Sequence, residues 1–557
     1  MKKLFLALVV TIALAACSNF DKSPTNDSAD NSAQPIEAKP EVPQVRDVTI
    51  TPANSYNDMF IDSTAVETFI KNKNVSAADA QSVRNFYNPR NYGFAWFFSD
   101  GLTEQGRAFW NAYTYANTHG QKDVSIDKQL NKRMDSLLDV ETVMIERNDT
   151  GFVNTEMALT LKFLQYKRNS DRQSLINKIP LTWLVPAKKT DELAMADSIL
   201  NNKEIAEVSD SINKPFYNLK GQLSKYDSIA KKGGWQPIIA RVGKLKKEVS
   251  SPIITLIKKR LQLTGEMEGT DTSRKYNDSL ELAIKSYQQQ NGLKADGVIT
   301  DSLVNVINVP ARERLKQILV NLNRMLWIPP QVKDNYVEVN IPDFMLNVYE
   351  GNIKAFDMPV VVGKEGSNTM MFTGDLNQIV FSPYWNVPAS IVRDEIVPAM
   401  QDDPNYLKTK RMEIVRKTDS LPVIRQLPGQ GNALGRAKFL FPNSFDIYLH
   451  DTEAKEVFEN RKRALSHGCI RLADAEKMAE YILRDQKEWT PSKINEAMNS
   501  TNPVEVAVKK KLPVVITYFT TWVDDEGQLV FRDDVYGHDK KMADRMFTSA
   551  SAAAPAI

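Results

Sequence analysis

The spacing of apolar residues changes near residue 336, and this change limits what the chain can fold into. From about 49 to 335 the apolar residues recur three and four positions apart, as at 66–70, which is the period of an amphipathic helix. From 337–341 onwards they alternate in short runs separated by Gly, Asn, Asp and Pro, which is typical of strands. The sequence therefore predicts an α+β protein, and its 557 residues predict several domains.

The chain divides into segments by composition and period. A helical scaffold domain is expected over 49–249, and its aromatic stretch at 92–98 is assigned to core packing, the usual role of such clusters. A small domain at 250–310 and a linking helix at 311–335 follow. We expect a β-rich domain over 336–484 and a C-terminal extension over 485–557, which packs on the scaffold or the β-rich domain and has a disordered end.

Residues 250–310 carry the start and stop signals of three short helices. Ser251 before Pro252 is an N-cap followed by proline in the first turn, and Gly265 is placed to end that helix. A second helix stops at Gly292, and Thr300 caps a third. Three helices around one small core are therefore expected.

The first residues have the pattern of an export signal. Lys2 and Lys3 precede an apolar run, and Leu14-Ala15-Ala16-Cys17 forms a small-residue cleavage site. This ending resembles the bacterial lipoprotein signal, which implies removal of residues 1–16 and lipidation of Cys17; an ordinary secretory peptide is the alternative. Residues 17–48 would then form a flexible tether. The expected location is periplasmic and lipid-anchored, and Ser18 in place of an aspartate favours the outer membrane.

The charge balance excludes one class of partner. Loss of residues 1–16 would leave 71 − 2 = 69 basic residues against 69 acidic ones. A neutral chain has no electrostatic basis for binding nucleic acid. With Cys17 lipidated, Cys469 is a single thiol that cannot form an internal disulfide, although exported proteins normally use cysteines in pairs.

Cys469 lies in a short cluster of potentially reactive residues. Two of the four histidines, His450 and His467, lie within nineteen residues of it. If 466–472 is extended, alternation places His467, Cys469 and Arg471 on one face. Gly468 would let a substrate backbone approach, and Asp474 would cap a helix that fixes the loop. A thiol with a neighbouring base is the arrangement of a cysteine nucleophile.

Other readings of the cluster remain open at this point. A lone cysteine is often a small buried hydrophobic residue. Zinc could be held by Cys469, His467 and His450, but the spacings typical of such sites are missing, so we predict no metal and no cofactor.

The motifs around the thiol resemble a known family. His450-Asp451-Thr452 and Ser466-His467-Gly468-Cys469-Ile470-Arg471 are similar to the L,D-transpeptidase catalytic domain, a β-rich fold with a cysteine nucleophile. The similarity continues at 383–388, 428–436 and 438–439, and 283–299 resembles three-helix peptidoglycan-binding domains. With 92–96 and 533–537, the chain is similar over most of its length to the large periplasmic L,D-transpeptidases, which combine a helical scaffold, a peptidoglycan-binding module and a lid-bearing catalytic domain.

The resemblance implies a role for each residue. Cys469 would attack the third residue of a peptidoglycan stem peptide, His450 would be the base, and the backbone of His467, Gly468 and Cys469 would form the oxyanion hole. What orients His450 stays open between the carbonyl and the carboxylate of Asp451. The residues implied to lie near substrate are Arg471, Ser466, Trp385, Tyr384 and Asn432.

A long, charged and poorly patterned segment, about 388–437, interrupts the β-rich domain. Loops of this length are functional, such as lids, or else disordered, and the resemblance favours a lid.

The expected function is the formation of 3→3 peptidoglycan cross-links. A tetrapeptide stem would be the donor, with loss of its terminal D-alanine, and an amine on a neighbouring stem would be the acceptor. The family resemblance also implies acylation by carbapenem-type β-lactams. Transfer to water or to a protein amine is one alternative, and a non-catalytic lipoprotein that tethers the membrane to peptidoglycan is another.

Overall fold

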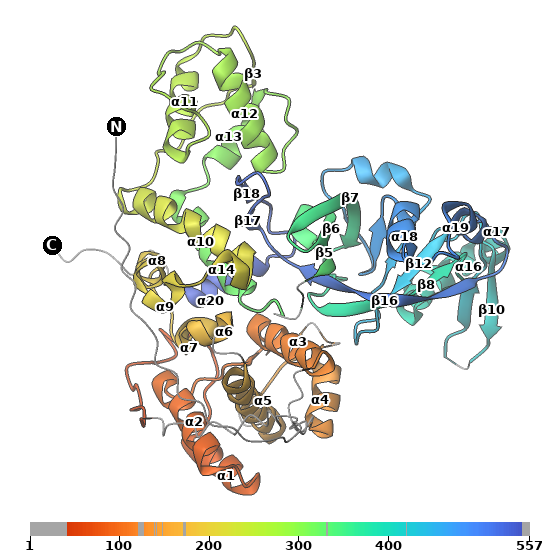
Figure 1. The fold of residues 1–557 in the computed structure, drawn as a ribbon, viewed down its shortest axis with the longest axis horizontal. Coiled ribbons are helices and arrows are strands. Elements are labelled where there is room, and N and C mark those ends of the chain that lie inside the picture. The colour runs from red at the N-terminus through yellow and green to blue at the C-terminus, as the bar shows by residue number, and fades with distance from the viewer. Residues whose placement is uncertain are drawn as a thin grey trace, which may run out of the picture. The chain divides into compact units, whose positions relative to one another are not determined.

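The structure is a computed structural model that describes residues 42–548, except 121–126, 139, 141, 147–148, 171–173, 330–331, 333 and 419 (Figure 1). The expected signal peptide, Cys17 and most of the tether lie outside the described residues. Within the described residues, no helix has the length and apolar character needed to cross a membrane. The three expected regions are confirmed: helical, small three-helix and β-rich.

The scaffold is helical, and its aromatic stretch is core, as predicted. Trp96 and Phe97 are fully buried and belong to one large hydrophobic cluster. The amides of Ala95 and Trp96 donate to the buried carboxylate of Glu156, at 2.6 and 2.9 Å. The main elements are α1 (Ser63–Asn72), α2 (Ala77–Tyr87), β1 (Phe97–Phe98), β2 (Gly101–Leu102), α3 (Glu104–Thr118), α4 (Lys128–Leu138), α5 (Thr150–Asn169), α8 (Glu192–Asn201) and α10 (Asp210–Lys231). Shorter helices are η1 (Asn88–Arg90), α6 (Leu175–Lys178), α7 (Leu181–Leu184) and α9 (Lys203–Ala206).

Two later helices complete this cluster. α14 (Ala311–Met325) was expected only as a linking helix, but its Leu315, Ile318 and Leu322 are fully buried in the scaffold core. α20 (His538–Met546) contributes Met542 and Met546 to the same core. This part of the C-terminal extension therefore packs on the scaffold, as predicted. The scaffold core therefore includes helices beyond the expected boundary at 249.

The small domain has the three predicted helices. They are α11 (Pro252–Thr264), α12 (Asp278–Gln290) and α13 (Asp301–Ile307). Ser251 caps α11, Gly265 ends it in the left-handed conformation at φ +89°, and Thr300 caps α13. A short ladder joins β3 (Lys244–Leu245) to β4 (Ile299–Thr300).

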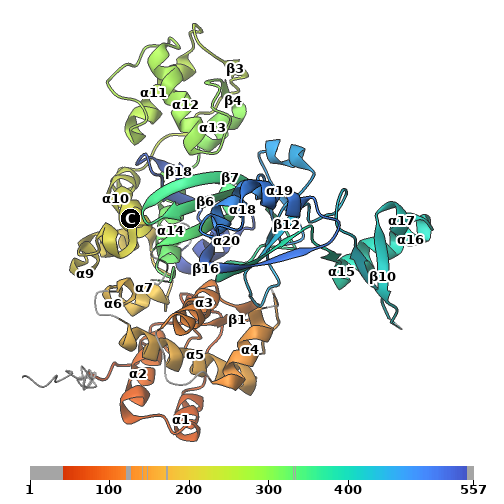
Figure 2. The ribbon, with the colours of Figure 1, turned by 45° about the vertical axis from the view of Figure 1, so that its right-hand side comes forward.

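The β-rich domain is one sheet that closes on itself (Figure 2). Its strand order is β14-β7-β15-β13-β12-β8-β16-β5-β6, and β6 also pairs with β7. Helices α18 (Ala475–Leu483) and α19 (Pro491–Met498) pack against the same hydrophobic core. The strands are β5 (Asn335–Asn340), β6 (Met345–Glu350), β7 (Ile353–Gly363), β8 (Thr373–Phe381), β12 (Ala437–Leu440), β13 (Leu449–His450), β14 (Ala464–Ser466), β15 (Ile470–Leu472) and β16 (Val504–Thr517).

The expected end of this domain at 484 is wrong. β16 begins twenty residues later, and it lies inside the sheet, antiparallel to β8 and parallel to β5. Its register shifts between Ala507 and Leu512, and the intervening Lys509, Lys510 and Lys511 are exposed. This interruption hides the alternation that would have marked a strand. Beyond it, β17 (Thr521–Val523) and β18 (Leu529–Phe531) form a separate hairpin.

The expected lid is a small folded insertion. It has its own hydrophobic cluster, formed by Val387, Ile391, Val392, Ile396 and Ile424. The chain leaves β8 and returns at β12, and Phe381 and Ala437 are register partners there. The insertion contains β9 (Trp385–Asn386), α15 (Ala389–Ile391), a π-helix (Val392–Ile396), α16 (Val397–Asp402), α17 (Tyr406–Thr409), β10 (Met412–Arg416) and β11 (Val423–Gln426).

Candidate active site

Cys469 sits on a tight turn between two strands that both pair with β7. β14 runs parallel to β7 and β15 runs antiparallel to it, so the chain reverses over 467–469. Gly468 makes this possible with φ +115°, which L residues rarely adopt. The expectation that 466–472 is one extended segment is therefore wrong, and alternation does not relate His467 to Cys469.

Hydrogen bonds hold the turn on both sides. The buried Ser466 hydroxyl donates to the carbonyl of Cys469 at 2.6 Å and accepts from the Gly468 amide at 3.1 Å. The hydroxyl of Thr369 donates to the Gly468 carbonyl at 2.7 Å and accepts from the Gly363 amide at 2.9 Å. Ser466 thus shapes the turn and does not present its hydroxyl to substrate. The Gly468 amide, expected to form part of the oxyanion hole, donates instead to the Ser466 hydroxyl.

The Cys469 thiol is partly buried in a polar environment. Tyr448 lies beside it, and the Cys469 Sγ lies 3.8 Å from the carbonyl oxygen of Asp446. Trp385 in turn hydrogen-bonds the Tyr448 hydroxyl. Burial raises the pKa of the Cys469 thiol, and the bonds from Tyr448 with the charge of Lys438 lower it in part. Burial therefore favours the protonated thiol of Cys469 over the thiolate.

His450 is buried and neutral. Its Nδ1 lies 2.6 Å from the backbone carbonyl oxygen of Asp451. The Asp451 carboxylate accepts instead from the Arg436 amide at 2.9 Å and from Lys455 Nζ at 2.8 Å. Burial, reinforced by the charge of Arg471, lowers the pKa of His450 to about 4. With Nδ1 donating to the carbonyl, Nε2 is an acceptor, which is the form a general base needs.

The register of the sheet places the polar residues on its outer face. Leu449 pairs with Ile470, and both are fully buried in the core. The neighbouring pair, His450 and Arg471, therefore faces the other way, together with Cys469, which precedes Ile470. Within the described residues, the buried Nε of Arg471 has no hydrogen-bond partner.

His467 contacts the insertion. Its Nε2 lies 2.8 Å from a carboxylate oxygen of Glu395, which belongs to the π-helix, and 3.5 Å from Lys364 Nζ. All the side chains in this pair are well exposed, so the pair contributes little to stability, on the order of 0–1 kcal/mol. This pair joins the turn at 467–469, which carries Cys469, to the insertion.

Two of the expected substrate-binding residues have other roles. Asn432 is buried, and its amide nitrogen donates to the carbonyls of Pro383 and Leu427 at 3.0 and 2.9 Å. Asn432 thus connects the two segments of the insertion that contain Pro383 and Leu427. The expectation that it binds substrate is therefore wrong. The Tyr384 ring, 4.3 Å from the Arg425 guanidinium carbon, packs against the insertion, whereas Trp385 reaches the active site through Tyr448.

No role was predicted for Tyr448, Lys438, Thr369 or Glu395. Tyr448 could have been found, because it lies two residues before His450 and therefore shares its face. Lys438 is the register partner of His450, and its Nζ lies 3.8 Å from the centroid of the Tyr448 ring. No cluster of three His, Cys, Asp or Glu residues that could hold a metal occurs among the described residues.

The pH dependence of thiol alkylation tests this electrostatic arrangement. Because the pKa of Cys469 is raised and that of His450 is about 4, no thiolate–imidazolium pair forms near neutrality. The rate of alkylation by iodoacetamide should rise about tenfold per pH unit from pH 6 to above 8. A plateau below pH 7, measured by mass spectrometry of the labelled protein, would mean that a thiolate already exists there.

Comparison with known families agrees with this arrangement. A family model described as "L,D-transpeptidase catalytic domain" matches residues 334–516, which end in β16. A model described as "Scaffold domain" matches 81–220, and one described as "Putative peptidoglycan binding domain" matches 250–307.

One curated protein and several solved structures are similar to parts of this chain. The chain is 29% identical over 243 residues to a "Putative L,D-transpeptidase" of Haemophilus influenzae; the match covers 41% of this chain and 49% of the relative. The chain thus spans about half the length of this curated relative. An L,D-transpeptidase structure from Stackebrandtia nassauensis is 13% identical, with a TM-score of 0.21 and coverage of 50% of this chain and 96% of that one. The catalytic domain from E. faecium L,D-transpeptidase acylated by ertapenem is 14% identical, with a TM-score of 0.15 and coverage of 33% and 97%.

These domains indicate a location in the cell envelope. Residues 334–516, which carry the partly buried thiol of Cys469, the neutral His450 and Arg471, therefore form a domain of the L,D-transpeptidase catalytic type, and residues 250–307 form a domain similar to peptidoglycan-binding domains.

Proposed function

We propose that this protein forms 3→3 cross-links in peptidoglycan through a thioester on Cys469. The observation that carries the proposal is the common placement of Cys469, neutral His450 and Arg471 on the outer face of the closed sheet. A thiol that must lose its proton during the reaction needs a nearby neutral base, and His450 has that form at neutral pH.

The first half of the reaction releases D-alanine. Sγ of Cys469 bonds to the carbonyl carbon of the third stem residue while the thiol proton passes to His450. The peptide bond to the terminal D-alanine then breaks, and the leaving amine takes the proton from His450. The stem remains on the enzyme as a thioester.

The second half transfers the stem. An amine of a neighbouring stem attacks the thioester carbon, the carbon–sulfur bond breaks, and the amine gives up a proton that restores the thiol. His450 carries this proton in the reverse direction to the first half. The product is an amide between two third residues.

Arg471 is the residue we propose to bind a substrate carboxylate. Its side chain shares the face of His450 and Cys469, and its buried Nε has no partner among the described residues. A buried guanidinium N–H without an acceptor is costly, and a stem carboxylate would satisfy it.

Acylation by a carbapenem follows from the same chemistry. The β-lactam carbonyl would take the position of the stem carbonyl, and Cys469 would open the ring to leave a stable adduct. This adduct also gives a direct readout of the nucleophile that does not depend on the acceptor.

Product analysis tests the proposal and separates it from its alternatives. Full-length protein is incubated with a disaccharide tetrapeptide, with and without an added D-amino acid as a second amine, and products are identified by mass spectrometry. We expect dimers joined between third residues, free D-alanine, and exchange products only when the amine is added. Tripeptide alone would indicate transfer to water, and unchanged substrate would leave only a tethering role.

A further inference from the structure

A large cavity lies apart from the active site. It has a volume of about 2310 Å³, and neither Cys469 nor His450 lines it. Pockets for small molecules usually measure about 300–1,000 Å³, so this cavity is large enough for several units of a polymer. Its occupant has to be inferred from its walls.

Several regions of the chain line the cavity, and four of them bear on what it can bind. The beginning of α10 forms one side, residues 286–294 of the peptidoglycan-binding domain form another, and the outer face of β5–β6 with the β17–β18 hairpin forms a third. The fourth is the segment 459–465, which leads directly into Ser466 and the nucleophile turn. A chain lying in the cavity would therefore contact both the binding domain and the strand that precedes the catalytic turn.

The catalytic domain and the segment after β18 both bond to the peptidoglycan-binding domain at this wall. Arg461 Nε donates to the carbonyl of Gly292 at 3.0 Å, and an Arg532 guanidinium nitrogen donates to the carbonyl of Gln290 at 2.9 Å. These bonds reach the last residue of α12 and the loop that follows it. The binding domain thus presents this loop to the cavity as part of a shared surface.

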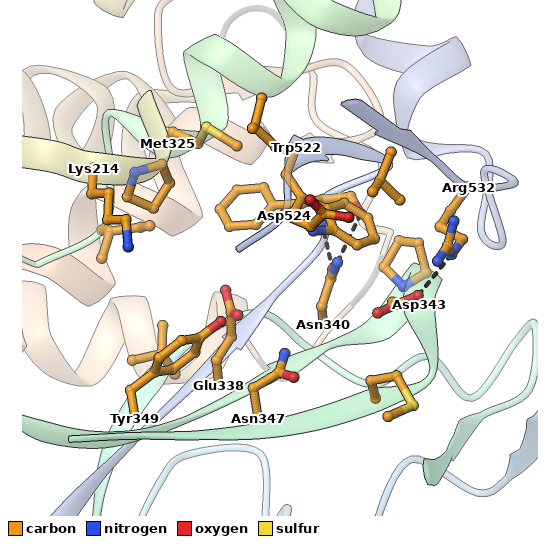
Figure 3. Close-up of a pocket in the computed structure, with 18 of the residues that line it drawn as sticks. Lys214, Met325, Glu338, Asn340, Asp343, Asn347, Tyr349, Trp522, Asp524 and Arg532 are labelled. Atoms are coloured by element: carbon orange, nitrogen blue, oxygen red, sulfur yellow. Dashed lines mark hydrogen bonds and ion pairs between the residues drawn. The ribbon is translucent and has the colours of Figure 1, made fainter. Parts of the chain in front are cut away.

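Side chains along β5 and β6 point alternately into the hydrophobic core and toward the cavity, of which they form the floor. Val337 and Val348 are fully buried, so their neighbours on β5 and β6 face outward. Tyr336 and Tyr349 stack there, with ring centroids 4.9 Å apart and planes inclined by 21°. Figure 3 shows Glu338, Asn347 and Tyr349 extending from these strands into the cavity, opposite Trp522 and Lys214.

The charges of the walls favour a neutral ligand. Three cations are already paired with carboxylates: Arg532 with Asp343 at 2.7 Å, Lys354 with Asp525 at 3.3 Å, and Arg461 with Asp533 at 3.2 Å. Asp and Glu residues also outnumber Lys and Arg residues in the lining, eleven to seven, so a polyanion would meet net repulsion.

Glu338 supports the same conclusion. Among the described residues it forms no ion pair, and Thr517 Oγ1 lies 3.5 Å from its carboxylate. Burial raises its pKa to about 7, so near neutrality the group both donates and accepts hydrogen bonds. A carboxyl group, an amide and flat aromatic rings on one surface suit a ligand rich in hydroxyls with apolar ring faces.

We propose that this cavity binds a glycan strand of peptidoglycan, with Tyr336, Tyr349 and Glu338 as the floor of the site. The inference rests on the proposed function, because it takes peptidoglycan as the substrate. The strand would be held jointly by the binding and catalytic domains, which would keep its stem peptides near the nucleophile turn.

Binding of isolated glycan strands tests the proposal. Strands freed of their stem peptides by an amidase are titrated into the full-length protein by calorimetry, with free stem tetrapeptide in a second titration. Tyr349→Ala should weaken binding of the strands by about tenfold, because one aromatic platform is lost. Tyr349→Phe should restore it, and Tyr217→Ala, an exposed aromatic on α10 outside the cavity lining, is the matched control.

Amide hydrogen exchange of the unmodified protein, measured with and without glycan strands, tests the proposal even if a variant fails to fold. Glycan strands should slow amide exchange in 335–350 and 521–531 as well as in 286–294. Slowing confined to 250–307, or binding of stem peptides without binding of strands, would overturn the proposal. Turnover of soluble disaccharide tetrapeptide by the same preparation reports separately on the proposed reaction, so failure of one is distinguishable from failure of the other.

Discussion

Replacing Cys469 with alanine is expected to abolish both 3→3 dimers and the carbapenem adduct. The sulfur forms the bond that stores the stem between the two half-reactions, and no other thiol lies among the described residues. Loss of a covalent nucleophile typically lowers turnover by about a thousandfold or more. Muropeptide analysis and intact-protein mass spectrometry measure the two products.

The interpretation of this variant depends on its fold. The cysteine side chain is small and only partly buried, so the free energy of unfolding should change by about 1 kcal/mol or less. Cys469→Ser is the closest isostere and should also be inactive, because Tyr448 and His450 cannot lower a hydroxyl pKa enough. Undiminished 3→3 dimers from the alanine variant would remove Cys469 from the mechanism.

Replacing Gly363, the last residue of β7, with alanine is expected to disrupt the neighbouring nucleophile turn. A Cβ atom at this position would lie 2.0 Å from the carbonyl oxygen of Ser367, 2.8 Å from the Thr369 amide and 3.0 Å from Gly468 Cα. All three are backbone atoms, so no side-chain rotation relieves the overlap. The Thr369 bridge between Gly363 and Gly468 must shift, and a displacement near 1 Å at a reacting group can cost about a hundredfold in rate.

The rate of carbapenem acylation and the thermal midpoint measure this effect together. We expect acylation to fall about a hundredfold and the free energy of unfolding to fall by about 1–3 kcal/mol or more. Gly221→Ala is the matched control, since a Cβ there meets nothing within 4 Å and the residue lies in α10. It should leave acylation unchanged and add up to about 1 kcal/mol of helix stability. An active Gly363→Ala variant would show that the turn does not depend on the Thr369 bridge.

Elements with local signals were predictable from the sequence. The three helices of the small domain begin and end where Ser251, Gly265 and Thr300 indicate, because a cap is decided by its own few residues. Asp474 likewise caps α18 by accepting from the Lys477 amide at 2.9 Å. The pairing of His450 with Cys469 was proposed from motif spacing and stays a prediction; the sheet register pairs His450 with Arg471, two residues after Cys469.

Features that depend on distant partners were not predictable. One glycine, Gly468, converts an apparent strand into a turn, because β14 and β15 both gain hydrogen bonds from β7. The bulge in β16 hides its alternation, although its two ends fit β8 and β5. Asn432 and Ser466 carry polar groups suited to substrate, but tertiary packing buries both and uses their hydrogen bonds internally.

The pairing of Phe381 with Ala437 makes the insertion a replaceable module. Both ends of the insertion meet at one residue pair of an antiparallel ladder. The only cost of the insertion to the closed sheet is therefore the entropy of closing one loop, which depends weakly on the length of the insertion. Doubling a loop costs only about 0.6 kcal/mol in closure entropy. Since the insertion also has its own hydrophobic cluster, substrate preference could diverge here by exchange of a whole subdomain while the sheet that carries Cys469 stays unchanged.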